Sequence, residues 1–399
     1  MTVGTVVVGA GQAGLAMSRC LTDRGLEHVV LDRAGIADSW RSRRWDSFTL
    51  LSPNWQTRLP GWHYSGPDPG GFMTGAEVAR YLEDYARSFR APVRTGVTVR
   101  RLYRVAGGWR LVTDAGRVEA PNVVVATGDL ARPRVPAMPL PAGVVGLHTA
   151  DYRNPAQLPA GPVLVVGAGP SGQQIALELA RAGREVHLAV GRHKALPRRY
   201  RGLDAYDWME RLGMLDRTVD TLPGPPGKTP NAVLTGGTRD LDVPRLVAEG
   251  VRAHGRLLGF DGGVPRFAAD LAANVAVAEE NAVRFRRSVD AFVERTGLAV
   301  APAAPSAAAT VAASAPAPVQ TVVWATGFGR DHGWIEAPVQ GVDGEIVHRR
   351  GVTPAAGLYL LGLRWQYRRS SSFLDGVGAD AEHLASVIAE RSGSRLLAA

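Results

Sequence analysis

Two short apolar runs, at residues 5–8 and 163–166, have the pattern of buried strands. Each run is followed by a glycine-rich segment, a stretch with helical periodicity and a further apolar run. Residues 5–32 and about 162–190 are therefore each predicted to form a βαβ unit. The pattern predicts an α/β protein with two Rossmann-like, three-layer domains.

The first glycine-rich segment, at residues 9–14, reads Gly-Ala-Gly-Gln-Ala-Gly. Glycines here let the backbone approach a pyrophosphate, and the helix N-terminus that follows supplies free N–H groups and a partial positive charge. The next apolar run ends at Asp32, eighteen residues after Gly14. A carboxylate near this spacing accepts hydrogen bonds from the ribose hydroxyls of an adenine dinucleotide. Residues 5–32 therefore predict a dinucleotide-binding site.

The second segment, at residues 167–172, reads Gly-Ala-Gly-Pro-Ser-Gly, and the next apolar run ends in Gly191 and Arg192 instead of an acid. A guanidinium pairs with phosphate through two hydrogen bonds, so an arginine here suits a ribose with a 2′-phosphate. Arg192 therefore indicates NADPH, while the alternative of an exposed basic turn without a ligand stays open. Two such sites in one chain indicate an enzyme that passes electrons between dinucleotides.

Other elements are predicted around these units. A capping-box pattern at Thr74 and Glu77 opens a helix that continues to about residue 89, and short alternating strands follow over about 93–126. Apolar residues at helical spacing predict one long helix over 267–294. The remaining segments are predicted as a connector at 131–161, a flexible insert at 299–318, a strand at 358–362 and a helix from about Ala379.

The tripeptide Ala-Thr-Gly ends two apolar runs, at 123–128 and 321–327. Small residues are needed where a strand end abuts a bound dinucleotide. A single copy would be an ordinary strand-end turn. Because one copy lies downstream of each glycine-rich segment, we favour a role at both dinucleotide sites.

Composition narrows the classes of function. The net charge is +9 over 399 residues, but the basic residues are almost all arginines and form no long run. This pattern disfavours nucleic-acid binding, and a positive field favours a polyanionic cofactor. The single cysteine, Cys20, excludes a disulfide framework or a CxxC pair within one chain, and the histidine spacing predicts no metal site. Without a signal-peptide pattern or a membrane-length apolar run, we expect a cytoplasmic protein.

With these features and the Trp- and Arg-rich stretch at 39–72, the chain resembles the two-dinucleotide flavoproteins. More narrowly, it resembles the class B flavin-dependent monooxygenases, especially their compact bacterial, YUCCA-like or CzcO-like branch. The resemblance implies a discontinuous FAD-binding domain at 1–150 and 320–399. It implies an inserted NADPH-binding domain at 151–319, in which about 200–319 forms a substrate or cap region.

The resemblance also assigns cofactor contacts. It implies FAD at Gly9, Gly11, Gly14 and Asp32, and NADPH at Gly167, Gly169, Gly172 and Arg192. The other cofactor-binding residues it suggests are Gln12, Ala13, Arg33, Trp40, Thr127, Gly128, Pro170, Ser171, Gln173, Ala325, Thr326, Gly327, Asp375 and Gly376. The C-terminal helix would direct its N-terminus at the flavin, where negative charge develops on reduction; the alternative is a plain packing helix.

Two residues are candidates for a catalytic role. Asp46 ends an Arg-Trp-Asp sequence that is similar to a segment near the flavin in Baeyer–Villiger relatives. Asn54 is the nearest match to an asparagine of animal-type members, offset by three residues. His148 and Tyr152 fit the family's linker motif, although the Phe and Gly that begin the motif are absent.

Because the cofactors carry the chemistry, the electron acceptor decides the function. The resemblance implies an NADPH- and FAD-dependent monooxygenase that transfers one oxygen atom from O₂, through a C4a-(hydro)peroxyflavin, to N, S or a carbonyl carbon. Two alternatives stay open: a flavoprotein reductase or oxidase without oxygen transfer, and a non-catalytic dinucleotide-binding protein that docks a partner through the long helix. We expect a small-molecule substrate, no nucleic-acid or membrane partner, and leave a homodimer open. The pocket wall is predicted to come from Trp45, Trp55, Trp62 and about 200–260.

Overall fold

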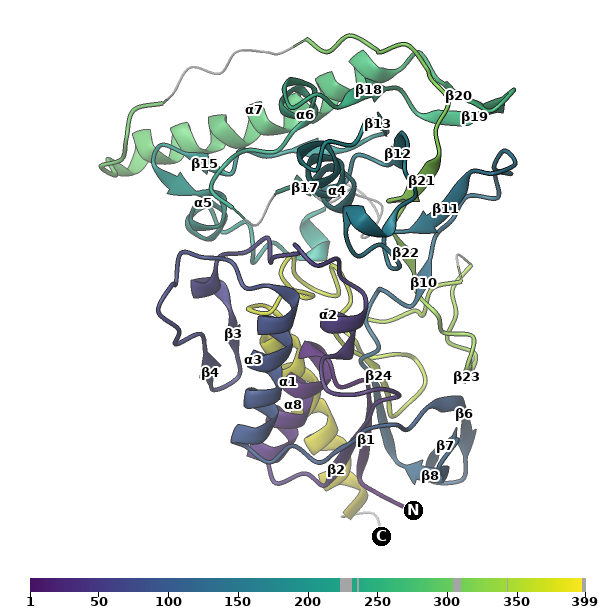
Figure 1. Ribbon diagram of the computed structural model, residues 1–399. Coiled ribbons are helices and arrows are strands. Elements are labelled where there is room, and N and C mark those ends of the chain that lie inside the picture. Colours follow the sequence, from purple (N-terminus) through teal and green to yellow (C-terminus); the bar gives the residue numbers. More distant parts are fainter. Residues whose placement is uncertain (223–231, 235–236, 304–309, 343, 397–399) are drawn as a thin grey trace.

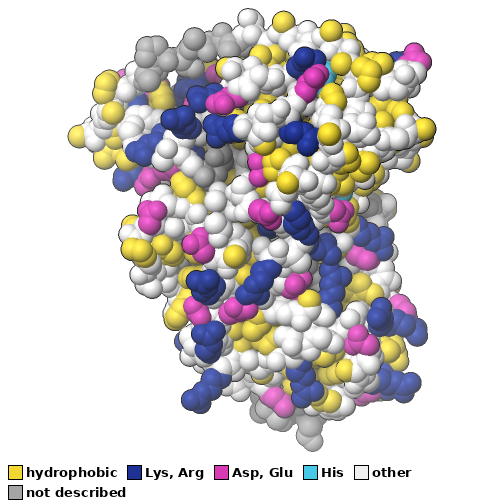
Figure 2. All heavy atoms as spheres, in the orientation of Figure 1, with side chains coloured by type: hydrophobic (Ala, Val, Ile, Leu, Met, Phe, Trp, Pro, Cys, Tyr) yellow, Lys and Arg dark blue, Asp and Glu magenta, His cyan; other side chains and the backbone are white. Residues whose placement is uncertain are grey.

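Two parallel sheets, each with helices packed on it, form the two halves of the molecule (Figure 1). The structure is a computed structural model that describes residues 1–222, 232–234, 237–303, 310–342 and 344–396. The lower half in Figure 1 contains both ends of the chain, and the upper half is built from its middle. On the face that Figure 2 shows, basic and acidic side chains are interspersed.

The first sheet lies in the lower half. Its strands run in the order β24 (Leu358–Leu360), β9 (Asn122–Val125), β1 (Thr5–Val8), β2 (His28–Leu31) and β5 (Val93–Arg94). All neighbours in this sheet are parallel. Strands β24, β9 and β1 are fully buried because both faces are covered, which is why they have nearly continuous apolar sequences, whereas the edge strand β5 is partly exposed.

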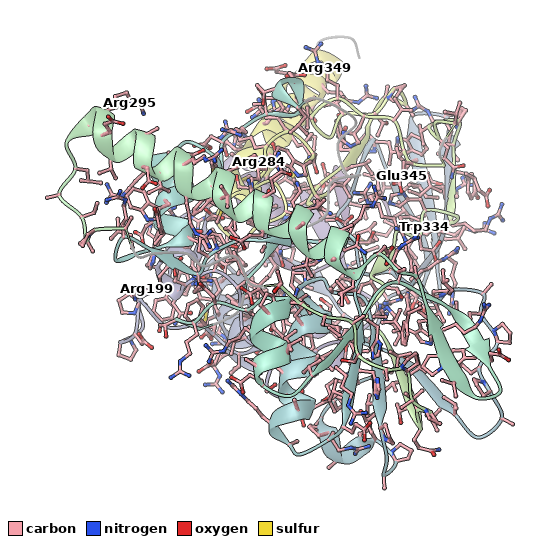
Figure 3. All side chains as sticks on the ribbon, turned by 90° about the horizontal axis from the view of Figure 1, so that it is seen from above. Arg199, Arg284, Arg295, Trp334, Glu345 and Arg349 are labelled. Carbon is pink, nitrogen blue, oxygen red and sulfur yellow. The ribbon has the colours of Figure 1, made fainter. Side chains whose placement is uncertain are left out.

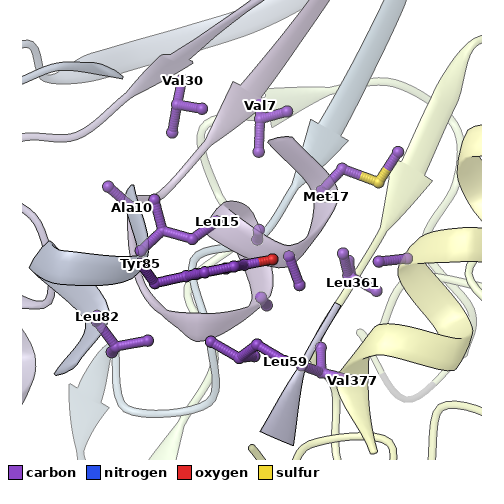
Figure 4. Close-up of a cluster of buried hydrophobic side chains, with 14 of the residues drawn as sticks. Val7, Ala10, Leu15, Met17, Val30, Leu59, Leu82, Tyr85, Leu361 and Val377 are labelled. Carbon is purple, nitrogen blue, oxygen red and sulfur yellow. The ribbon is translucent and has the colours of Figure 1, made fainter. Parts of the chain in front are cut away.

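Helices cover one face of this sheet and a small second sheet covers the other. The helices are α1 (Gln12–Asp23), α3 (Gly75–Ser88) and α8 (Val377–Leu396), and their buried side chains meet in the cluster of Figure 4. Thr74 and Glu77 form the predicted capping box at the start of α3. The other face packs on the sheet of β23 (Ile335–Glu336), β6 (Val99–Val105), β7 (Gly108–Thr113) and β8 (Gly116–Ala120).

The sheet of the upper half repeats this plan. Its parallel strands are β11 (Val145–His148), β21 (Thr321–Trp324), β12 (Val163–Val166), β13 (Val186–Ala189) and β18 (Arg252–His254). Helices α4 (Pro170–Arg181) and α6 (Val243–Ala248) pack on one face. The hairpin of β19 (Leu257–Asp261) and β20 (Val264–Phe267) packs on the other face.

The long helix predicted at 267–294 is α7 (Leu271–Thr296), which is seen along its length in Figure 3. Its apolar stripe packs against its own chain: Leu271 and Val275 join the core of the second sheet, and Phe285 and Val289 pack in one cluster with Trp208. This burial removes the feature that suggested a docking surface for a partner. A homodimer stays a prediction.

Two short strands, β10 (Arg132–Pro133) and β22 (Phe328–Gly329), pair where the chain passes between the halves. The division into domains at 150 and 320 stays a prediction. All residues of β11 and β21 lie a few positions outside the predicted range 151–319, yet the two strands pair with each other in the upper sheet. The remaining elements are α2 (Asp38–Ser42), α5 (Ala205–Arg211), β3 (Arg58–Leu59), β4 (Trp62–His63), β14 (Lys194–Ala195), β15 (Arg199–Tyr200), β16 (Leu203–Asp204), β17 (Ala232–Val233) and the 3₁₀ helices η1 (Asn54–Gln56), η2 (Pro155–Gln157) and η3 (Val219–Thr221).

The predicted fold class is confirmed: both βαβ units form, each within a parallel sheet that is layered between other elements. Helix α8 begins two residues before the predicted Ala379. The predicted insert at 299–318 is described except for residues 304–309, which lie outside the described residues, and its described part contains no helix or strand.

Candidate dinucleotide-binding cleft

The first glycine turn connects β1 to α1 and is closed by steric contacts. Gly9 has φ +110°, and a Cβ placed there would lie 2.5 Å from the Ala126 carbonyl oxygen. A Cβ on Gly14 would lie 1.8 Å from the Gly9 oxygen. A Cβ on Gly11 would meet no protein atom within 4 Å, so only this glycine faces open space. The turn therefore leaves room for a ligand at the N-terminus of α1, whose cap residue supplies no side-chain hydrogen bond.

The second turn, between β12 and α4, has the same construction. Gly167 has φ +113°, and its added Cβ would lie 2.6 Å from the Ala325 oxygen. On Gly172 the Cβ would lie 1.8 Å from the Gly167 oxygen, whereas on Gly169 it would meet nothing within 4 Å. Ala126 and Ala325 begin the two Ala-Thr-Gly tripeptides. The structure therefore brings each tripeptide against its own glycine turn.

The residues after the second strand of each unit differ, as the sequence indicated. Asp32 follows β2, and its carboxylate accepts hydrogen bonds from the backbone N–H of Ala10 at 2.8 Å and of Ala34 at 2.9 Å. The acid is thereby fixed beside the first turn. Arg192 lies two residues beyond Val190, is exposed, and lines the cleft that also contains Gly167 and Gly169.

One cleft of about 2430 Å³ lies between the halves. This volume exceeds the roughly 300–1,000 Å³ of pockets for a single drug-sized ligand. Its lining includes Gln12 and Trp40 from the lower half and residues of the second turn and of 325–327 from the upper half. The lining contains more basic than acidic residues. Its seven arginines are Arg44, Arg134, Arg192, Arg330, Arg349, Arg350 and Arg364, and its three acids are Asp129, Asp220 and Glu345. The excess positive charge suits phosphate-bearing ligands.

Gln12 connects three parts of the lower wall. Its amide oxygen accepts from the indole Nε1 of Trp40 at 3.2 Å, and its Nε2 donates to the carbonyl of Ser372 at 3.1 Å. Ser372 and Phe373 line the cleft directly before α8 begins at Val377. The segment that leads into α8 is therefore at the cleft, and the role of this helix end in stabilising negative charge there stays a prediction.

Asp375 lies between the cleft-lining segment and α8. Its side chain is only 9% exposed, and its nearest basic group is the Arg58 guanidinium at 3.9 Å. Burial raises the pKa of Asp375 to about 6, while the charge of Arg58 opposes this shift. Gly376 follows, where a Cβ would lie 2.1 Å from the Ser370 oxygen.

The linker residues hold the second unit. The His148 Nδ1 accepts from the N–H of Ala150 at 3.1 Å, so its Nε2 carries the proton and donates to the Gly327 carbonyl at 3.0 Å. This bond fixes the second Ala-Thr-Gly turn. Tyr152, fully buried, donates to Glu178 of α4 at 2.8 Å.

The two candidate catalytic residues do not line the cleft, and their roles stay predictions. Asp46 is exposed and accepts from the Asn154 amide at 2.6 Å. Asn54 is buried; its Nδ2 donates to the Asp68 carbonyl at 2.9 Å, and its Oδ1 accepts from the N–H of Met73 at 2.8 Å. The amide of Asn54 therefore holds the 68–73 loop in place.

The other predicted contacts separate into those at the cleft and those beside it. Residues that line it are Gln12, Trp40, Gly167, Gly169, Pro170, Ser171, Arg192, Ala325, Thr326 and Gly327. Thr127 and Gly128 lie just before the lining residue Asp129, Arg33 is exposed, and Gln173 is buried with its Nε2 donating to the Ala168 carbonyl. Of the three tryptophans predicted in the pocket wall, Trp45 lines the cleft, while Trp55 and Trp62 pack elsewhere.

Sequence reasoning missed the cleft residues that come together only on folding. Tyr206 of α5 lines the cleft opposite Phe373, with their rings edge to face at 6.4 Å. Arg330 pairs with Asp129 at 2.6 Å and Glu345 at 2.8 Å. The only local signal for Arg330 and Asp129 was their place just after the Ala-Thr-Gly tripeptides. Tyr206 lies within the range of about 200–260 that was predicted to contribute to the pocket wall, but nothing in the sequence singled out this residue.

Two absences apply to the part of the chain that is described. No helix there combines the length and apolar character that crossing a membrane requires. No group of three or more His, Cys, Asp or Glu side chains there has the geometry to hold a metal ion.

The fold and the cleft define an oxidoreductase class with two dinucleotide-binding units. The family model of pyridine nucleotide-disulphide oxidoreductases matches residues 6–202. A CzcO-like oxidoreductase of Geobacillus kaustophilus is 36% identical over 96% of this chain and 97% of its own. The chain belongs to the class B flavin-dependent monooxygenase family, in its CzcO-like branch.

One further relative and one solved structure are also similar to this chain. An indole-3-pyruvate monooxygenase of Oryza sativa, YUCCA1, is 36% identical over 51% of this chain and 52% of its own. A flavin-containing monooxygenase from Stenotrophomonas maltophilia has the same fold, with a TM-score of 0.70 at 22% identity, over 98% of this chain and 99% of its own. The family implies a flavin and a nicotinamide cofactor.

Proposed function

We propose that this protein is an NADPH- and FAD-dependent monooxygenase that transfers one oxygen atom from O₂ to N, S or a carbonyl carbon of a small molecule. The observation that supports this most is the pair of matching glycine turns at one cleft, with a carboxylate after one strand and an arginine after the other. A bound flavin would accept hydride from the nicotinamide and react with oxygen, which is chemistry that side chains do not supply.

The residues present fit both cofactors. Gly11 and Gly169 leave open space at two helix N-termini, where backbone N–H groups would bind pyrophosphate. Asp32 would accept from the ribose hydroxyls of FAD, and Arg192 would pair with the 2′-phosphate of NADPH. Ser372 and the N-terminal end of α8 would face the reactive ring, where the helix dipole favours negative charge.

The test measures whether electrons from NADPH end in peroxide or in an oxygenated product. Purified protein is mixed with NADPH, and NADPH oxidation, oxygen uptake and peroxide release are measured with and without amines, thioethers and ketones. We expect a compound that accelerates NADPH oxidation, consumes one O₂ per NADPH, releases little peroxide and gains one oxygen atom by mass. Prompt, stoichiometric peroxide release with every compound and no oxygenated product would instead support the reductase or oxidase function.

A further inference from the structure

Arg44 is one of several cleft-lining arginines that form no ion pair among the described residues. Arg44 lines the cleft, and no carboxylate of the described residues forms an ion pair with it. Its Nε is buried without a hydrogen-bond partner, and its Nη1 donates only to the carbonyl of the adjacent Arg43, at 3.3 Å. An unsatisfied buried donor costs about 1–3 kcal/mol, and more when the group is charged. A ligand that accepts from this guanidinium would remove that cost.

The guanidinium is held in a fixed position. Its Cζ lies 5.0 Å from the ring of Trp40 and 5.0 Å from the ring of Phe48, so two aromatic rings flank it. Burial lowers the pKa of Arg44 to about 10, and the charge of Arg43 adds to this effect, yet Arg44 stays charged at neutral pH. A planar cation between two rings is preorganised for an anion, and a lysine would not reproduce this geometry.

The neighbours of Arg44 indicate which anion binds. The indole of Trp40 donates a hydrogen bond to Gln12, which lies in the first glycine turn and is the first residue of α1. The Arg44 guanidinium lies over this indole, so Trp40 connects it to the turn. The backbone N–H groups of that turn are the predicted pyrophosphate cradle. Arg44 thus lies on the same wall of the cleft as this cradle.

We infer that Arg44 binds the pyrophosphate of the flavin dinucleotide, as a cationic side chain that complements the backbone N–H groups of the first glycine turn. This inference rests on the proposed function, because it takes FAD as the ligand of the first turn. Asp32 would then accept hydrogen bonds and the glycines would leave space, whereas Arg44 would add a full positive charge to the partial charge of the helix N-terminus.

The test compares flavins with and without the pyrophosphate. Flavin is removed from the wild type and from Arg44→Gln, Arg44→Lys and Arg43→Gln, and the Kd of each protein for FAD and for riboflavin is measured by flavin fluorescence. Arg43 is the matched control, since it lies outside the cleft lining and donates to the carbonyl of Leu130 at 2.5 Å. We expect Arg44→Gln to weaken FAD binding about 10- to 100-fold and riboflavin binding less than twofold. Arg44→Lys should lose nearly as much, and Arg43→Gln less than about twofold.

Several results would overturn the inference. One is an FAD Kd within twofold of wild type in Arg44→Gln; another is an equal loss for riboflavin, which would show that Arg44 only supports the pocket structure. A third is a selective loss of NADP⁺ affinity, measured in the same titrations, which would place the nicotinamide cofactor at Arg44. A wild-type protein that binds neither flavin would instead overturn the proposed function, and this inference with it. Thermal unfolding of each variant identifies misfolding, and Arg44→Lys, which keeps the charge, provides the second readout if Arg44→Gln does not fold.

Discussion

The two glycine turns have nearly the same backbone and differ in the residue that follows the second strand. The added-Cβ distances at the third glycines are both 1.8 Å, and those at the first glycines are 2.5 and 2.6 Å. After the second strand of each unit, the Asp32 carboxylate accepts a hydrogen bond from the N–H of Ala10, whereas Arg192 is exposed in the cleft. Steric contacts therefore fix the same backbone in both turns, while the side chain at the strand end is the difference that, under the proposed function, would set which ribose each turn accepts.

The largest effect is expected from alanine at the third glycine of either turn. At Gly14 or Gly172 the new Cβ would overlap a backbone oxygen, so the turn must open. We expect each variant to lose more than about 3 kcal/mol of unfolding free energy. If the halves fold independently, Gly14→Ala should lose flavin content, and Gly172→Ala should keep flavin but lose NADP⁺ binding. Absorbance of the purified protein and urea unfolding measure both quantities.

The matched controls are Gly11→Ala and Gly169→Ala. Both positions have negative φ and no atom within 4 Å of the added Cβ, so stability should change by less than about 0.5 kcal/mol. Their methyl groups would occupy the space of the ligand, and each variant should weaken the binding only of the dinucleotide at its own turn. If a control variant loses as much stability as its partner, the comparison of the two turns is wrong.

Asp375 is expected to make the unfolding free energy depend on pH. Because its folded pKa is about 6, above the roughly 4 of the unfolded chain, the folded protein binds this proton more tightly. Its contribution to stability is therefore complete below about pH 4 and falls by about 2–3 kcal/mol as the pH rises to 6. Asp375→Asn should remove this decline. The difference between wild-type and variant unfolding free energies over pH 4–8 is the measurement, and two parallel curves would contradict it.

Arg192 tests the difference between the turns directly. Arg192→Ala should raise the KM for NADPH about 10- to 50-fold, through loss of the paired phosphate, and leave the KM for NADH within twofold. The ratio of the two KM values separates a lost 2′-phosphate contact from a general defect. An unchanged preference for NADPH would show that other residues recognise the phosphate.

The smallest effect is expected from removing the hydrogen bond that holds α4, the helix after the second glycine turn. Tyr152→Phe removes the hydrogen bond to Glu178 of α4 but keeps the buried ring. We expect a loss of about 1 kcal/mol of unfolding free energy, with flavin content unchanged, because the lost hydrogen bond is to α4 of the upper half and the ring stays in place. Thermal unfolding together with flavin absorbance measures both. Loss of flavin in this variant would show that this hydrogen bond also affects the lower half, whose Trp45 packs in the same cluster as Tyr152.

The sequence predicted the parts of the fold that are set by local pattern. The strands at 5–8 and 163–166, the capping box at Thr74 and the long helix α7 follow from apolar periodicity and from caps over a few residues. The glycine turns were also predictable, because their steric requirement lies within one short segment.

The rest of the site depends on contacts between distant residues. Arg198 donates to the Leu51 carbonyl at 2.6 Å across 147 positions, and Asp375 lies beside Arg58. Such pairs leave no periodic signal. A comparison with a short family motif suggested Asn54 as a catalytic residue. In the fold, however, its amide nitrogen and oxygen both form hydrogen bonds with the 68–73 loop.

The most direct test of the central claim is an anaerobic titration of the flavin-loaded protein with NADPH, followed by absorbance and by the amount of flavin that passes a filter. If both coenzymes occupy the cleft together, the yellow flavin bleaches with one equivalent of NADPH and stays bound to the protein. If the flavin stays oxidised, or is released as NADPH is added, the two turns do not bind two coenzymes at once, which contradicts the proposed function.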